Sequence, residues 1–293
     1  MKSILILTVS SATLATAALA NTTFDNTEKF AWGANTGWIS FRHDQPVSPA
    51  GVVFGGAFLS GYAWAANTGW IHFGNGAPTN GHSYSNTGND HGVNHDGTGN
   101  LSGFAWAANT GWINFGWATP SDPNRPRVSL LTGEFSGQAW SANTGWINLG
   151  TGLLTTQSMS DVDSDNDGIP DWWEMLHFNN LTTANGTSDN DGDGVSDLHE
   201  YLTGTDPNDA DNYLRVVSHS HDLDITETTL EFTTTPTRLY RIYFSDDLGI
   251  DDPWTDSALG TFSPDAGTTT RTITYPGNPK KFFRVQALVP LAP

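Results

Sequence analysis

Two acidic loops carry the residues whose types and spacing point most directly to chemistry. Residues 163–174 and 189–200 each have aspartate at the first, third, fifth and ninth positions and glutamate at the twelfth. Calcium takes about six to eight oxygen ligands, and this spacing supplies them from carboxylates and one backbone carbonyl at the seventh position. We therefore expect two calcium ions, held by Asp163, Asp165, Asp167, Ile169, Asp171 and Glu174, and by Asp189, Asp191, Asp193, Val195, Asp197 and Glu200.

The surrounding sequence supports this interpretation. Gly168 and Gly194 occupy the sixth position, where the loop must turn sharply. Residues 159–212 contain 14 acidic residues and no Lys or Arg. A solvated acidic segment without metal is the alternative, but two complete matches in one chain favour calcium. Because the clustered carboxylates repel one another, we expect the metal to order this segment.

A short helix should follow each loop, since apolar residues recur at helical spacing in residues 171–178 and 197–202. No amphipathic helix precedes the first loop, so the units are loop–helix rather than helix–loop–helix. With the closing residues 204–207, they resemble the EF-hand-like loops of thrombospondin type 3 repeats, in the cysteine-free form found in secreted planctomycete and verrucomicrobial proteins. The resemblance covers about residues 161–212 and implies calcium-ordered spacers without catalysis. Dockerins are less similar, because Trp172 and Trp173 stand where their recognition residues are small and polar.

The first half of the chain contains a fourfold repeat, Ala-Trp-x-Ala-Asn-Thr-Gly-Trp-Ile, in residues 30–41, 62–73, 104–115 and 138–149. Asn-Thr-Gly between two aromatic and β-branched runs predicts a β-hairpin. With an odd number of loop residues, both tryptophans lie on one face. A third strand is expected before the hairpins, for example at residues 51–54. The units should form a β-meander array, either closed like a propeller or stacked like a solenoid.

The tryptophans of these repeats allow two interpretations. They could be platforms on which sugar rings stack, or large side chains that fill the core of thin repeat units. We favour the core for most of them, because the turn is repeated as strictly as the aromatic residues. The insert at residues 81–96 holds His82, His91 and His95; a solvated loop is favoured there over a transition-metal site.

The ends of the chain indicate its compartment and its third domain. Residues 1–20 have the pattern of a secretory signal peptide, and their apolar core is too short for a membrane anchor. Short alternating strands from residue 213 onward suggest a small β-sandwich. We predict a mainly β protein with a signal peptide (1–20), a repeat domain (21–156), a calcium-binding module (157–212) and a C-terminal β-sandwich-like domain (213–293).

Composition narrows the function. The net charge of −19 argues against nucleic-acid partners, and no long apolar run predicts membrane insertion. The chain has no cysteine, so calcium would stabilise it in place of disulfides. No nucleophile elbow, zinc-protease motif or phosphate-binding glycine loop is present. We expect a non-catalytic, secreted or cell-surface protein that binds calcium and adheres, or binds polysaccharide or surface glycans, through its repeats. A structural matrix or surface-layer component is the alternative, and a protein accessory to a carbohydrate-active enzyme is less favoured.

Overall fold

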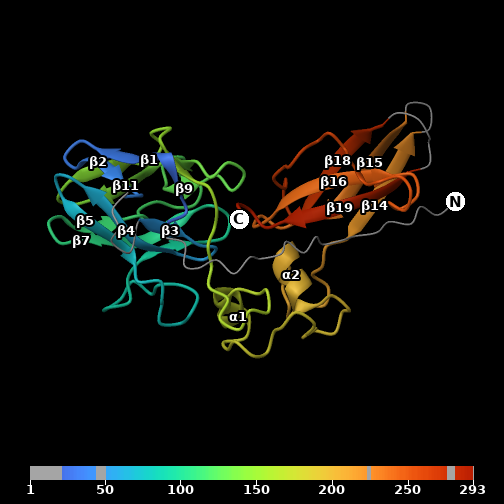
Figure 1. Ribbon diagram of the computed structural model, residues 1–293, viewed down its shortest axis with the longest axis horizontal. Coiled ribbons are helices and arrows are strands. Elements are labelled where there is room, and N and C mark those ends of the chain that lie inside the picture. Colours follow the sequence, from blue (N-terminus) through green and yellow to red (C-terminus); the bar gives the residue numbers. More distant parts are fainter. Residues whose placement is uncertain (1–21, 44–50, 223–225, 276–280, 293) are drawn as a thin grey trace. The chain divides into compact units, whose positions relative to one another are not determined.

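The computed structural model describes residues 22–43, 51–222, 226–275 and 281–292, and these are mainly β-strand with two short helices (Figure 1). The predicted signal peptide lies outside the described residues. Contacts divide the chain into two compact units, with the boundary between Thr183 and Ala184, and Leu291 returns to the first unit. The predicted calcium module therefore spans this boundary, and each unit is described by itself.

The four repeats form four hairpins that close into one eight-stranded antiparallel barrel. Neighbouring hairpins hydrogen-bond to each other in the order β12-β11-β8-β7-β5-β4-β2-β1, and β1 pairs with β12. The predicted array is thus closed, but as one continuous sheet. The strands are β1 (Phe24–Gly33), β2 (Gly37–Ser40), β4 (Leu59–Ala65), β5 (Gly69–Gly74), β7 (Leu101–Ala107), β8 (Gly111–Asn114), β11 (Gln138–Ser141) and β12 (Gly145–Asn148).

Short accessory strands extend the hairpins, as predicted. Strand β3 (Val52–Phe54) pairs with β4, β6 (Val93–His95) pairs with β7, and β9 (Arg127–Val128) pairs with β10 (Phe135–Ser136) just before β11. The first hairpin receives its accessory strand from the other end of the barrel sequence, because β13 (Leu154–Thr156) pairs with β1. The chain entering the barrel is therefore held by the chain leaving it.

The barrel interior is filled by alanine, isoleucine and phenylalanine, while the repeat tryptophans lie outside. Ala63 and Ile71 are buried, whereas the eight repeat tryptophans keep 37–50% of their surface exposed. The prediction that most of these tryptophans form the core is wrong. Side chains alternate across each strand, and an eight-stranded barrel has a narrow interior that small and branched residues fill. The predicted placement of both tryptophans of a hairpin on one face is confirmed by their direct pairing, as for Trp64 and Trp70.

The Asn-Thr-Gly turns also connect the hairpins. Three residues link the strands, and the glycine that follows them, such as Gly111 with φ 75°, takes a left-handed conformation that other residues rarely adopt. The Asn143 amide donates to the Thr110 carbonyl of the preceding repeat (2.8 Å). Between the first and last repeats, Asn35 donates to the Thr144 carbonyl (3.1 Å). The turn sequence therefore fixes both the hairpin and its contact with the next one.

The second unit contains two three-stranded antiparallel sheets. One has the order β14-β15-β18 and the other β17-β16-β19. Residues of both sheets, including Phe232, Ile242, Ile273 and Val285, form one buried cluster. No helix among the described residues is long and apolar enough to cross a membrane. The strands are β14 (Val216–Asp222), β15 (Glu227–Thr233), β16 (Leu239–Ser245), β17 (Thr255–Asp256), β18 (Thr268–Thr274) and β19 (Phe282–Leu288).

Candidate calcium sites and the tryptophan belt

Each acidic loop leads directly into a helix of seven residues, α1 (Asp171–His177) or α2 (Asp197–Thr203). In the second loop the Ser196 side chain accepts a hydrogen bond from the His199 N–H and so caps α2. In the first loop Pro170 stands at the same place with extended dihedral angles. The helices carry the twelfth loop residue back toward the aspartates, which is the arrangement that the spacing predicted.

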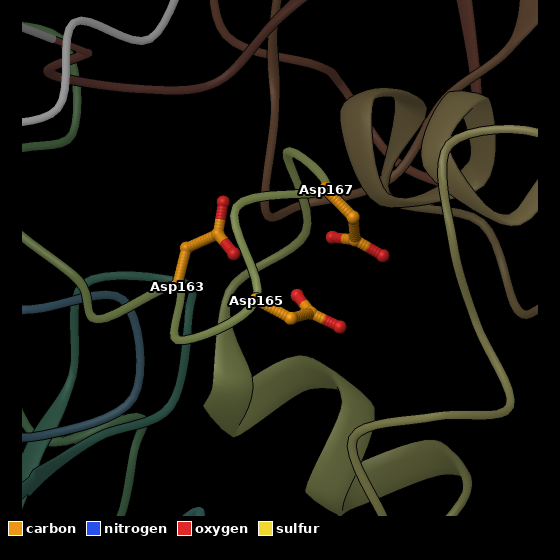
Figure 2. A group of neighbouring side chains, drawn as sticks. All are labelled: Asp163, Asp165 and Asp167. Atoms are coloured by element: carbon orange, nitrogen blue, oxygen red, sulfur yellow. The ribbon is translucent and has the colours of Figure 1, made fainter.

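The first three aspartates of each loop converge. In both triplets, Asp163 with Asp165 and Asp167, and Asp189 with Asp191 and Asp193, one carboxylate oxygen of each residue lies within 4.8 Å of the others. Figure 2 shows the first triplet, in which the carboxylates of Asp165 and Asp167 face one another. These two triplets are the clusters of three or more possible metal ligands within the described part of the chain.

Equivalent hydrogen bonds shape the two loops. Asp163 accepts from the N–H groups of Asn166 (2.7 Å) and Gly168 (3.0 Å). In the second loop Asp189 accepts from Gly192 (2.8 Å) and Gly194 (3.0 Å). Gly168 and Gly194 have φ angles of 96° and 92°, which explains glycine at the sixth position. Each backbone therefore wraps around its first aspartate.

Glu174 and Glu200 are the most informative residues of the two sites. Both are fully buried, and neither Glu174 oxygen nor Glu200 Oε2 has a hydrogen-bond partner. Burial, followed by the negative charge of nearby aspartates, raises the pKa of each glutamate to about 8. One oxygen of Asp167, Asp191 and Asp193 is likewise buried and unpartnered. Unpaired buried carboxylates are costly, and a divalent cation would satisfy them together.

The ninth loop residues have a different role in the structure. Asp171 accepts hydrogen bonds from the backbone and hydroxyl of Ser164 (2.7 and 2.6 Å). Asp197 accepts from the Ser188 hydroxyl and from the Asn190 N–H. These carboxylates close the loops, so direct coordination would compete with these bonds. At the seventh position, the N–H groups of Ile169 and Val195 donate to the aspartate at the fifth position of the same loop. The carbonyl groups of these two residues remain predicted calcium ligands.

The first site is packed against the barrel. Asp161 accepts a hydrogen bond from the Gly56 N–H (2.8 Å), and the Trp172 ring covers Gly56 so closely that a Cβ there would lie 2.9 Å from it. Met175 similarly covers Gly81. The sequence does not predict these contacts, because a glycine gives no local signal of which distant side chain packs against it.

The second site is packed against the C-terminal sheets. Arg238 is buried, donates to the carbonyls of Leu202 (3.0 Å) and Tyr201, and lies over the Tyr201 ring. Thr235 donates to the Thr203 carbonyl (3.3 Å). Arg238 thus bonds the C-terminal end of α2, the helix that carries the buried Glu200 of the second acidic loop. Its importance was missed because an arginine after a turn gives no sign of its partner.

The eight repeat tryptophans form a second candidate site, which we call the tryptophan belt. Within each hairpin the two indoles pair edge to face or nearly so, with centroids 4.7–4.9 Å apart. The belt consists of Trp32, Trp38, Trp64, Trp70, Trp106, Trp112, Trp140 and Trp146. Each pair is the direct cross-strand contact that the barrel register creates.

The histidines of the insert are not all in a solvated loop. His95 lies in β6 with 5% exposure; its Nε2 accepts from the Gly99 N–H (3.0 Å), and burial lowers its pKa. The prediction of a solvated insert is therefore wrong for His95, whose ring is buried and packs against Phe54. His91 instead contacts Trp112 of the belt and His72.

Comparisons with models of known protein families, with curated proteins and with solved structures find no match to this chain.

Proposed function

We propose that this protein binds two calcium ions, one in each acidic loop. The observation that carries the proposal is the pair of fully buried glutamates beside converging aspartates: both oxygens of Glu174 and Oε2 of Glu200 lack hydrogen-bond partners. Glutamate at the twelfth loop position offers two oxygens to calcium. The resemblance to thrombospondin type 3 loops supports the same assignment. Asp171 and Asp197 would act through water or by holding the loop closed.

Calorimetry on the metal-free protein tests the proposal. Two calcium ions should bind per chain, with Kd values between the extracellular range of about 10⁻⁴–10⁻³ M and the tighter sensor range. Glu174→Gln and Glu200→Gln keep the shape of the side chain but remove its charge, and each should eliminate one of the two sites. A metal-free protein that takes up no calcium would contradict the assignment, as would uptake unchanged in both variants.

We further propose that the protein is non-catalytic, secreted or displayed at the cell surface, and binds polysaccharide through the repeat domain. The exposed tryptophans support polysaccharide binding, since indole faces stack on sugar rings. The two C-terminal sheets share one buried cluster and would form a small β-sandwich that serves as a terminal module. A structural matrix component remains the second candidate. Concentration-dependent assembly without saturable glycan binding would favour that alternative.

A further inference from the structure

The tryptophan belt places eight large, partly exposed aromatic side chains on the solvent side of the barrel. Tryptophan is highly buried on average in folded proteins, yet all eight of these residues keep 37–50% of their surface exposed. Contiguous apolar surface on a protein generally marks a binding site. Because the barrel core is complete without them, the tryptophans are not needed on the outside to fill space.

Further aromatic rings pack against the belt. Beyond the pairing within each hairpin, the second tryptophan is contacted edge to face by Phe30 in the first hairpin (6.1 Å) and, within 5 Å, by a further ring in each of the other three. The three closer contacts are His43 with Trp70 (4.7 Å), His91 with Trp112 (4.9 Å) and Trp117 with Trp146 (4.8 Å). Rigid aromatic side chains lose little conformational entropy on binding, so this arrangement favours recognition.

Hydrogen-bonding groups lie beside the indoles. The register sets a polar residue opposite the first tryptophan of the next hairpin, as with Asn114 opposite Trp140. The Asn114 oxygen accepts from the Gly116 N–H (2.7 Å), which leaves its amide N–H groups for another partner. Among the described residues none of the eight indole N–H groups has an acceptor, whereas Trp117 donates to the Gln138 carbonyl. The equivalent polar residues are Ser40, His72 and Asn148.

The belt carries no charge. Outside β1, the seven other barrel strands contain no Asp, Glu, Lys or Arg. The chain as a whole has a net charge of −19, so an anionic polymer would be repelled and would find no cation on the belt to bind it. On the seven strands outside β1 a cationic ligand would find no carboxylate. Apolar ring faces with neutral hydrogen-bond donors match an uncharged sugar.

Because the barrel is closed, its shape distinguishes a flat binding partner, such as a membrane, from a polymer with a repeating unit. The hairpins follow one another around the barrel wall, so the four pairs face outward in different directions. A membrane or one second copy of the chain would cover only some of them. A polymer with a repeating unit can occupy several pairs, and several polymer segments can occupy all four.

We propose that the tryptophan belt binds neutral polysaccharide at four equivalent subsites, one per hairpin. Each subsite consists of an indole pair with its neighbouring polar residue. The inference rests on the proposed polysaccharide-binding function and adds the position, number and charge preference of the subsites. Linked subsites raise the affinity for a long chain well above that for a short oligosaccharide.

The test uses the calcium-loaded full-length protein with three neutral polymers, hydroxyethylcellulose, galactomannan and arabinoxylan. We expect saturable binding of at least one, with a change in tryptophan fluorescence, and no binding of polygalacturonate. Trp38→Ala, Trp70→Ala, Trp112→Ala and Trp146→Ala should each weaken it by about threefold, and the quadruple variant by more than about 100-fold. The matched control is Trp254→Ala, which removes a tryptophan of the second unit and should leave binding unchanged.

Each result that differs from this expectation would overturn a specific part of the proposal. A folded quadruple variant that binds like the wild type refutes the belt, while polysaccharide binding itself would stand. Failure of all three neutral polymers refutes both. Binding to phosphatidylcholine vesicles, or self-association in ultracentrifugation, that only the belt variants lose would assign the belt to a membrane or a second copy. Circular dichroism verifies that each variant is folded. If the quadruple variant unfolds, the four single variants provide the test. A folded single variant that binds no polymer would show that the four subsites are not equivalent.

Discussion

At the scale of single residues, two glutamates carry the proposal that the loops bind calcium. Glu174 and Glu200 are buried among carboxylates, and their pKa values rise from 4.5 to about 8. Between these two values the metal-free folded protein holds protons that the unfolded chain has released. The free energy of unfolding of the metal-free protein therefore falls as pH rises from about 4.5 to about 8. Calcium in the proposed sites should reverse this loss, because it would bind the ionised form.

Calcium binding should consequently release protons at neutral pH. Calorimetry in two buffers of different ionisation enthalpy should show release approaching one proton per site at pH 6.5, and almost none at pH 9.5. Affinity should rise with pH over the same interval. Glu174→Gln and Glu200→Gln together should abolish the release. Equal heats in both buffers at pH 6.5 would show that these glutamates are already ionised in the metal-free protein.

The observed burial also reverses which side chain of the repeat should cost more free energy of unfolding when it is truncated to alanine. Trp112 is 45% exposed and Ile113 only 2%. Trp112→Ala should lower the free energy of unfolding by about 0.5–1.5 kcal/mol, the value of an aromatic pair. Ile113→Ala should cost about 2–5 kcal/mol, as usual for a buried aliphatic side chain. Urea denaturation of the two neighbouring variants measures the difference, and a larger cost for the tryptophan would contradict the observed burial.

At the scale of elements, the Asn-Thr-Gly turn recurs unchanged in all four hairpins. Its asparagine amide bonds to the carbonyl of a neighbouring turn, its threonine is buried at the end of the barrel, and its glycine takes positive φ. The tryptophans add an interaction across the strands. The hairpin is therefore specified locally, while the asparagine joins it to the next.

A substitution in the turn should separate these contributions. Gly111→Ala places a Cβ on a residue with φ 75° and should lower the free energy of unfolding of the barrel by about 1–2 kcal/mol. Asn109→Ala removes the bond to the Thr68 carbonyl (3.1 Å) and should cost about 1 kcal/mol. Gly267→Ala, where a Cβ meets no atom within 4 Å, is the control and should be near neutral. A neutral Gly111→Ala would mean that the turn changes its conformation at no cost.

At the scale of the whole molecule, the two proposed calcium sites belong to different compact units. The first loop packs on the barrel through Asp161 and Trp172, and the second on the C-terminal sheets through Arg238. The segment that the sequence predicts to be one calcium-binding module is thus divided between two compact units, each with its own core. We expect each ion to stabilise the unit against which its loop packs.

Differential scanning calorimetry should reveal this division. Calcium at 100 times its Kd should stabilise each unit by about 2.7 kcal/mol relative to the metal-free protein. Asp163→Ala should remove the calcium-dependent shift of the barrel transition alone, and Asp189→Ala that of the C-terminal transition alone. Each aspartate also accepts backbone hydrogen bonds, which the alanine variants lose whether or not calcium is present. The quantity to compare is therefore the change in transition temperature that calcium causes in each variant. One cooperative transition that both variants shift equally would show that the units unfold together.

The sequence by itself determined the local features. The twelve-residue loops, the short helices after them, the hairpins and the shared face of each tryptophan pair follow from ligand spacing, turn chemistry and strand alternation. These depend on residues close together in the chain. Asp163 and Glu174 are only eleven positions apart, so a pattern can relate them.

The tertiary structure alone decided what lies inside. Whether the Ala63–Ile71 face or the Trp64–Trp70 face of a hairpin points to the core depends on how the four hairpins close, which is a property of the pairing between β1 and β12. A narrow closed interior accepts alanine and excludes indole. The partners of Arg238, and the burial of Glu174 and Glu200, likewise depend on packing between distant segments. Local spacing contains no information about such contacts.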